Sequence, residues 1–151
     1  MTTWLFDITF LLAVPFWALM IVAPGWSWTG RLLRSPWSAT APLAVYVLLA
    51  VPEFGRLWEV VSRPDLETLR AFLATPEGAA AIWAHLIAFD LFVGRWIHHD
   101  ARARGVPHLL VAPVLVLTIL LSPFGLLAYL LIRVVKAESP GSKLADRELQ
   151  Q

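Results

Sequence analysis

Three residues that could carry chemistry, His85, Asp90 and Arg95, interrupt an otherwise apolar stretch between positions 77 and 98. An imidazole and a carboxyl group can exchange protons, and a guanidinium can hold a polar end group. At mid-depth in a bilayer an ionisable side chain costs about 2.5–3.5 kcal/mol even on a lenient scale, so it needs a partner or a task. We expect Asp90 to act as acid or base with His85 as its proton partner. Arg95 or Arg56 would hold a polar group of the ligand.

Structural roles explain the same residues without chemistry. On one helix His85 and Asp90 lie about 140° apart, as do Asp90 and Arg95, so their partners must come from other helices. A single buried Asp can serve only to hydrogen-bond two helices, and an Arg near a helix end can extend to the headgroups. Both readings stay open on the sequence alone.

The composition indicates that the helices carrying these residues lie in a membrane. Of the 151 residues, 58% are hydrophobic and only 15% are charged, whereas soluble domains have about 45–50% and about 25%. The net charge of +1 offers no basic face for nucleic acid. The absence of cysteine excludes disulfides and thiolate chemistry.

The apolar runs predict an all-α fold, an integral membrane four-helix bundle forming a single domain over 1–136. A span needs about 20 apolar residues, and we place the four spans at 4–24, 38–58, 77–98 and 107–133. The first is expected to be a span and not a cleaved signal, because no basic residue precedes it. Thr75-Pro76-Glu77 is typical of a helix start. The fourth should kink at Pro113 and at Ser122-Pro123-Phe124-Gly125, where Pro123 would leave the Ile119 carbonyl unpaired.

The segments outside the spans complete the expected topology. Ser62–Leu73 has helical spacing of apolar and charged residues and predicts a short interfacial helix between spans two and three. Residues 137–151 form a polar tail. Four spans put both termini on one side, with seven of the twelve basic residues: Arg56, Arg63, Arg70, Arg133, Lys136, Lys143 and Arg147. The other five lie more densely in two short loops; we favour cytoplasmic termini.

Metal and nucleotide chemistry find little support. His98-His99-Asp100 resembles a metal site, but with His108 it offers two or three ligands at most. Gly25, Gly30 and Gly55 form no phosphate loop, and no serine nucleophile elbow occurs. We expect neither a metal nor a cofactor.

The third apolar stretch resembles the signature of the abscisic-acid-deficient-four-like, or neoxanthin synthase-like, membrane proteins. The matching residues are Trp83, His85, Asp90-Leu91-Phe92, Arg95 and Asp100. Weaker matches are Pro15-Phe16-Trp17-Ala18-Leu19-Met20 with Pro24, and Pro123-Phe124-Gly125. The resemblance covers three of the four expected spans.

This resemblance implies a four-span membrane protein that modifies a carotenoid or xanthophyll. In plants the family's reaction converts violaxanthin to neoxanthin, which opens an epoxide and removes a carbon-bound proton without a redox cofactor. His85, Asp90 and Arg95 would be the catalytic residues of such a cofactor-independent isomerase. Arg56 and five aromatic residues would bind the polyene: Trp17, Trp83, Phe89, Phe92 and Phe124.

Ten Arg against two Lys, with many Ala and Leu, suggest a bacterial member, hence a multi-pass protein of the inner membrane. Its partners would be membrane lipids and a polyene-like substrate. The alternatives are a non-catalytic membrane subunit, a pigment-binding protein, or a small transporter. A transporter of this size would have to associate with copies of itself.

Overall fold

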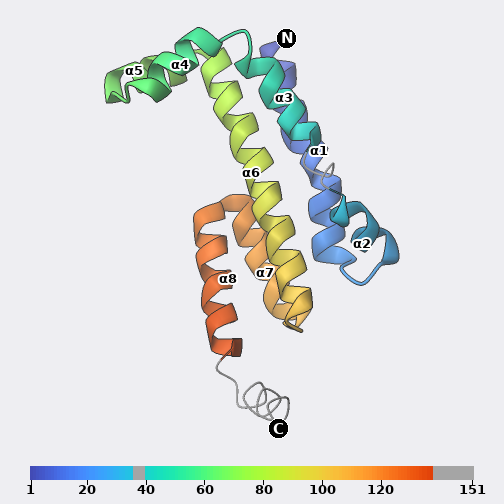
Figure 1. Cartoon of the computed structure of the whole chain (residues 1–151). Coiled ribbons are helices and arrows are strands. Elements are labelled where there is room, and N and C mark those ends of the chain that lie inside the picture. Colours follow the sequence, from blue (N-terminus) through green and yellow to red (C-terminus); the bar gives the residue numbers. More distant parts are fainter. Residues whose placement is uncertain (36–39, 138–151) are drawn as a thin grey trace. The chain divides into compact units, whose positions relative to one another are not determined.

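The computed structural model describes residues 1–35 and 40–137. All regular structure in these residues is helical, which confirms the all-α prediction (Figure 1). The helices are α1 (Thr2–Val22), α2 (Ser27–Arg34), α3 (Thr40–Ala50), α4 (Phe54–Ser62), α5 (Leu66–Leu73), α6 (Pro76–Ala103), α7 (His108–Leu120) and α8 (Ser122–Ala137).

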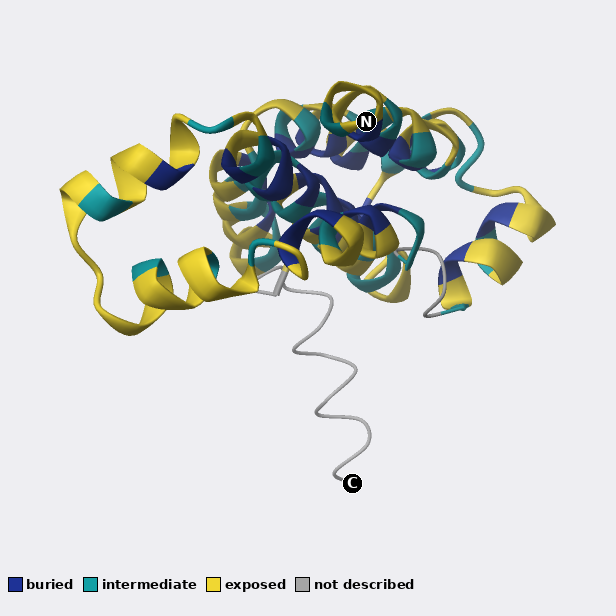
Figure 2. Ribbon diagram, turned by 90° about the horizontal axis from the view of Figure 1, so that it is seen from above, coloured by how far each residue is buried: buried dark blue, intermediate teal, exposed yellow. Residues whose placement is uncertain are grey.

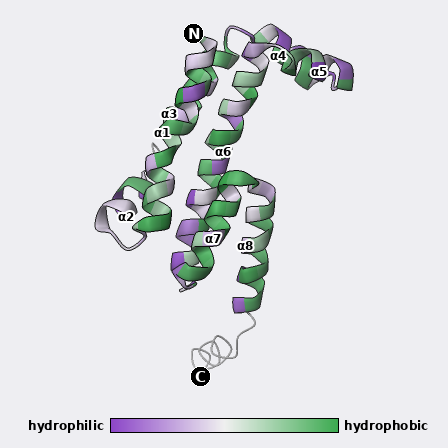
Figure 3. Ribbon diagram, turned by 180° about the vertical axis from the view of Figure 1, so that it is seen from behind, coloured by the Kyte–Doolittle hydropathy of each residue, from purple (hydrophilic) through white to green (hydrophobic). Residues whose placement is uncertain are grey.

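Two of the described helices, α1 and α6, are long and apolar enough to cross a membrane by length and composition. At about 1.5 Å per residue, the 28 residues of α6 extend roughly 42 Å. The apolar helices α3 and α7 have only 11 and 13 residues. Figure 3 shows how hydrophobic residues dominate α1, α7 and α8. A bundle of four full-length spans is therefore not what the described residues form.

The chain groups into two compact units, residues 1–92 and residues 93–151. The boundary falls inside the continuous helix α6. The single domain over 1–136 therefore stays a prediction. Of the predicted tail, residues 138–151 lie outside the described part.

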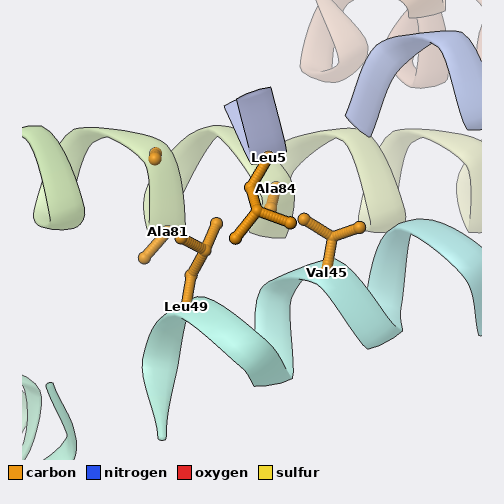
Figure 4. Close-up of a cluster of buried hydrophobic side chains, with 6 residues drawn as sticks. Leu5, Val45, Leu49, Ala81 and Ala84 are labelled. Atoms are coloured by element: carbon orange, nitrogen blue, oxygen red, sulfur yellow. The ribbon is translucent and has the colours of Figure 1, made fainter. Parts of the chain in front are cut away.

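The core of the first unit forms where α1, α3 and the start of α6 meet (Figure 4). Leu5, Val45 and Leu49 supply the large side chains. Their counterpart on α6 is a stripe of small residues, Ala80, Ala81 and Ala84. Because alanine has no side chain beyond Cβ, it lets neighbouring helices approach closely.

The predicted second span is two helices in the structure. α3 ends at Ala50, a turn covers Val51–Glu53, and α4 begins at Phe54. Pro52 explains the break, because proline lacks an N–H and disfavours helical geometry in the preceding residue. One continuous helix over 38–58 was therefore wrong, and residues 38 and 39 lie outside the described part.

The predicted interfacial helix corresponds to α5, preceded by the amphipathic α4. α5 begins at Leu66, later than expected, because the Asp65 carboxylate caps it by accepting from the backbone N–H of Thr68 at 3.0 Å. That hydrogen bond lowers the pKa of Asp65. Figure 2 shows α4 and α5 as mostly exposed.

The predicted start of α6 at Thr75 is confirmed. The Thr75 hydroxyl donates to the carbonyl of Phe72 at 2.7 Å and accepts from the N–H of Gly78 at 3.1 Å. One side chain thus ends α5 and begins α6. Gly78 is required there, because a Cβ would meet the Phe72 carbonyl oxygen, with the carbonyl carbon at 2.8 Å.

In the second unit α6 ends in a glycine turn. Gly105 has φ +61°, its N–H donates to Arg102, and the Val106 N–H donates to the Ala101 carbonyl at 2.9 Å. Val106 and Ala101 are both buried. These are the features of a Schellman motif, in which glycine occupies the left-handed position.

The predicted fourth span is a helical hairpin, so one kinked helix over 107–133 was wrong. α7 and α8 lie side by side (Figures 1 and 3), and Lys136 near the end of α8 donates to the Gly105 carbonyl, before α7, at 3.2 Å. The helix stops at Leu121, and Pro123 falls in the first turn of α8. In the first turn of a helix the N–H groups have no intrahelical acceptor, so a proline at that position removes no helical hydrogen bond. The predicted kink inside one continuous helix, with Pro123 leaving the Ile119 carbonyl unpaired, therefore does not apply.

Candidate functional site

His85 lies between two aromatic rings of the first unit. Its imidazole stacks on Phe89, one turn along α6, with ring centroids 4.7 Å apart. It also meets Tyr46 of α3 edge-on at 5.4 Å. The side chain is half-buried. The ring is therefore held between α3 and α6.

An apolar groove begins beside this imidazole. Leu43, Ala88, Phe89 and Phe92 line it, and its volume is about 200 Å³. His85, Ala88, Phe89 and Phe92 follow the spacing i, i+3, i+4, i+7, which puts them on one face of α6. Phe89 and Phe92 are 55% and 57% exposed, so the groove is open along its length. The arrangement suits one end of a long apolar ligand.

Asp90 lies on a different flank of α6. Ala84, Ile87 and Leu91 mark the buried stripe of this helix. With about 100° between successive residues, His85 falls on one side of that stripe and Asp90 on the other. The Asp90 side chain is half-buried. Among the described residues, those lining the groove do not include Asp90, so the structure does not bring the two predicted proton-transfer groups to one groove.

Trp83 lies on α6 two residues before His85 and contacts α1. Its ring stacks on Phe6 of α1 with centroids 5.2 Å apart. Its Nε1 is buried and finds no hydrogen-bond acceptor within the described part of the chain. An indole N–H in that state is open to a polar group of a ligand or a water.

The remaining predicted residues are dispersed. Trp17 is buried, with 4% of its surface exposed, and is not among the described residues that line the groove. The Arg56 side chain is 64% exposed and pairs with Glu53 at 3.4 Å. Arg95 and Phe124 belong to the second unit, where Arg95 is half-buried and Phe124 is 62% exposed.

Sequence reasoning missed two features. Tyr46 contacts His85 from α3, and no sequence pattern pointed to that contact. In the second unit Asp100 accepts from the Tyr129 hydroxyl and from Arg104 Nε, the latter at 2.7 Å. No spacing rule connects position 100 with position 129. Among the described residues no three His, Asp or Glu gather as metal ligands.

A family model described as ABA DEFICIENT 4-like matches residues 4–129, which is most of the chain. The chain belongs to the ABA DEFICIENT 4-like family. No curated protein and no solved structure matches it. The family resemblance drawn from Trp83, His85, Asp90-Leu91-Phe92, Arg95 and Asp100 is therefore confirmed. The match runs from α1 to the middle of α8, so the groove and the contact between Asp100 and Tyr129 lie inside the matched region.

Proposed function

We propose that this ABA DEFICIENT 4-like protein binds a long apolar, carotenoid-like lipid in the groove beside His85 and modifies it by proton transfer. The observation that carries the proposal is the imidazole stacked on Phe89, a residue that itself lines the groove. A volume of about 200 Å³ is below the roughly 300–1,000 Å³ of sites that enclose a ligand. One end of the substrate would occupy the groove while the rest lies in lipid.

The chemistry would be an isomerisation. One group donates a proton to the substrate while another removes a proton from carbon, so that no electrons are gained or lost. His85 is the proton-transfer group at the groove, and the Tyr46 ring that contacts it carries a hydroxyl. Asp90, on the other flank of α6, takes no direct part in this step, and Arg56 is the arginine of the first unit that would hold a polar end group.

The proposal includes a membrane setting. α1 and α6 would cross the bilayer, and α4 and α5 would lie at its surface among membrane lipids. On α4 the exposed apolar residues Phe54, Trp58 and Val61 share one face, while Arg56 and Glu59 lie on the other. We place the protein in the inner membrane of a bacterial cell.

Pigment analysis of a host that lacks the gene tests the proposal. The wild-type chain should restore one carotenoid that the deletion removes. His85→Phe keeps an aromatic ring on Phe89 but cannot transfer a proton, so it should fail to restore that product. Phe89→Ala should reduce it by opening the groove. Phe54→Ala is the matched control, because Phe54 is a similarly exposed phenylalanine of the first unit and is not among the described residues that line the groove.

An unchanged carotenoid profile in the deletion strain would overturn the enzymatic proposal. Purification in mild detergent then separates the alternatives. A polyene absorbing visible light that co-purifies with wild type and with His85→Phe would identify a pigment-binding protein, which the aromatic packing of His85 also favours. A non-catalytic subunit or transporter would co-purify without it.

A further inference from the structure

The second unit carries an excess of positive charge. Within residues 93–137 five side chains are basic and only Asp100 is acidic; the basic ones are Arg95, Arg102, Arg104, Arg133 and Lys136. Three of them, Arg104, Arg133 and Lys136, gather near Asp100 and Gly105. Within the described part of the chain this cluster has one carboxylate against three cations, so its described side chains carry a net positive charge.

Asp100 holds the two guanidinium groups in place. Arg104 Nε lies 2.7 Å from Asp100 Oδ2, and Arg133 Nε lies 3.6 Å from the same oxygen. The Arg104 and Arg133 side chains are 38% and 36% exposed, whereas that of Asp100 is only 18% exposed. Both contacts are made through Nε of the arginine. Paired guanidinium groups of this kind bind phosphate oxygens well.

Aromatic and aliphatic side chains surround the cluster. The Arg133 guanidinium lies over the Trp96 ring, 5.8 Å from its centroid, and Tyr129 meets Trp96 edge-on. One turn before Arg133 on the same face of α8, Leu130 is 37% exposed, and the Trp96 ring under the Arg133 guanidinium is also 37% exposed. A phosphate bound by the arginines would therefore lie beside these two apolar side chains.

We propose that the cluster of Asp100, Arg104, Arg133 and Lys136 binds the phosphate of an anionic phospholipid headgroup. The phosphate contacts the arginines and Lys136, and the acyl chains start along Trp96 and Leu130. Inorganic phosphate offers the same oxygens but makes no use of those apolar side chains, which is why we assign the site to a lipid. The inference rests on the membrane setting proposed above but not on the carotenoid chemistry.

The test is a titration of the full chain, purified in a neutral detergent at low salt, with short-chain phosphatidylglycerol. Intrinsic tryptophan fluorescence follows Tm, because a ligand that binds the folded state raises it. Phosphatidylglycerol should raise Tm and phosphatidylcholine should not. Salt at about 0.5 M, where the Debye length is only a few ångströms, should abolish the effect. Lys136→Gln and Arg133→Gln should each weaken the apparent affinity about fivefold.

Arg70→Gln is the matched control, because Arg70 is an exposed arginine paired with Glu67 on α5; this variant should respond as wild type does. If Arg133→Gln does not fold, Lys136→Gln decides, with lipid retained in native mass spectrometry as a second measurement. Equal responses to both lipids, a wild-type response in Lys136→Gln, or an equal response to inorganic phosphate would each overturn the proposal. None of these outcomes depends on carotenoid turnover.

Discussion

A single carboxylate, that of Asp100, connects two helices of the second unit. It accepts from Arg104, one turn further along the chain, and from the Tyr129 hydroxyl of α8. Tyr129 is fully buried. Removing the carboxylate would leave that hydroxyl without its acceptor and two guanidinium groups facing each other.

Asp100→Ala should therefore lower the free energy of unfolding by about 1–3 kcal/mol, the range for a buried polar group left unpaired. Tm measured by tryptophan fluorescence in detergent checks this. Asp7→Ala, which removes an exposed carboxylate of α1, should leave Tm unchanged. Equal Tm values for the two variants would show that Asp100 is not a stabilising contact.

At the scale of single residues, the sequence indicated which side chains could carry chemistry but not which side chains they contact. His85 and Asp90 stand out because ionisable residues are costly in an apolar stretch. Helical spacing already showed that they lie about 140° apart. The contact of Tyr46 with His85 joins positions 39 residues apart in two helices. No local pattern encodes such a contact, since it depends on how α3 packs against α6.

Among the elements, the α7–α8 hairpin depends on one glycine. A Cβ on Gly125 would meet the Thr118 hydroxyl, with the Thr118 Cα and backbone N both at 2.6 Å. The two helices are thus in direct backbone contact at this point, and no larger residue fits without moving them apart.

Gly125→Ala should cost about 1–3 kcal/mol of stability, as overpacking in a tight contact does. Gly55→Ala is the control: nothing lies within 4 Å of a Cβ built there, and alanine favours helix by about 0.5–1 kcal/mol over glycine. Thermal unfolding of both variants checks the prediction. A Gly125→Ala protein as stable as Gly55→Ala would mean that the helices are further apart.

Helix ends were predictable where a side chain or a proline marks them, as Thr75 does for α6. The α7–α8 hairpin could not be predicted in this way. An uncharged segment from 107 to 132 satisfies the same hydropathy test whether it is one long helix or two short ones. The proline signal was present at Pro123, but a proline also kinks a continuous helix. The close contact between Gly125 and Thr118 distinguishes a hairpin from one kinked helix. It is a contact between two packed helices, which local sequence does not specify.

For the whole molecule, the hairpin changes the expected topology. A continuous fourth span would put the 103–107 loop and residue 136 on opposite sides of the membrane. Instead Lys136 donates to the Gly105 carbonyl. The end of α8 and the end of α6 therefore lie close together, and in the proposed membrane setting they would share one side of the bilayer.

Single-cysteine variants test this directly, because the chain has no cysteine of its own. Ala103→Cys and Val135→Cys should both react with a membrane-impermeant maleimide from the same side of intact spheroplasts or of inverted vesicles. Labelling from opposite sides would restore the fourth full span. The unmodified chain provides the blank.

The turn between α7 and α8 uses its own backbone groups. The Leu121 N–H donates to the Leu117 carbonyl at 2.7 Å, and the Leu121 carbonyl accepts from the N–H groups of Phe124 and Gly125. Pro123 has no N–H to satisfy. In the proposed membrane setting, a bend at which Leu121 pairs both its backbone groups presents fewer unpaired groups to hydrocarbon than an ordinary loop does. In that setting we expect the hairpin to enter and leave through a single leaflet, as a wedge and not a crossing.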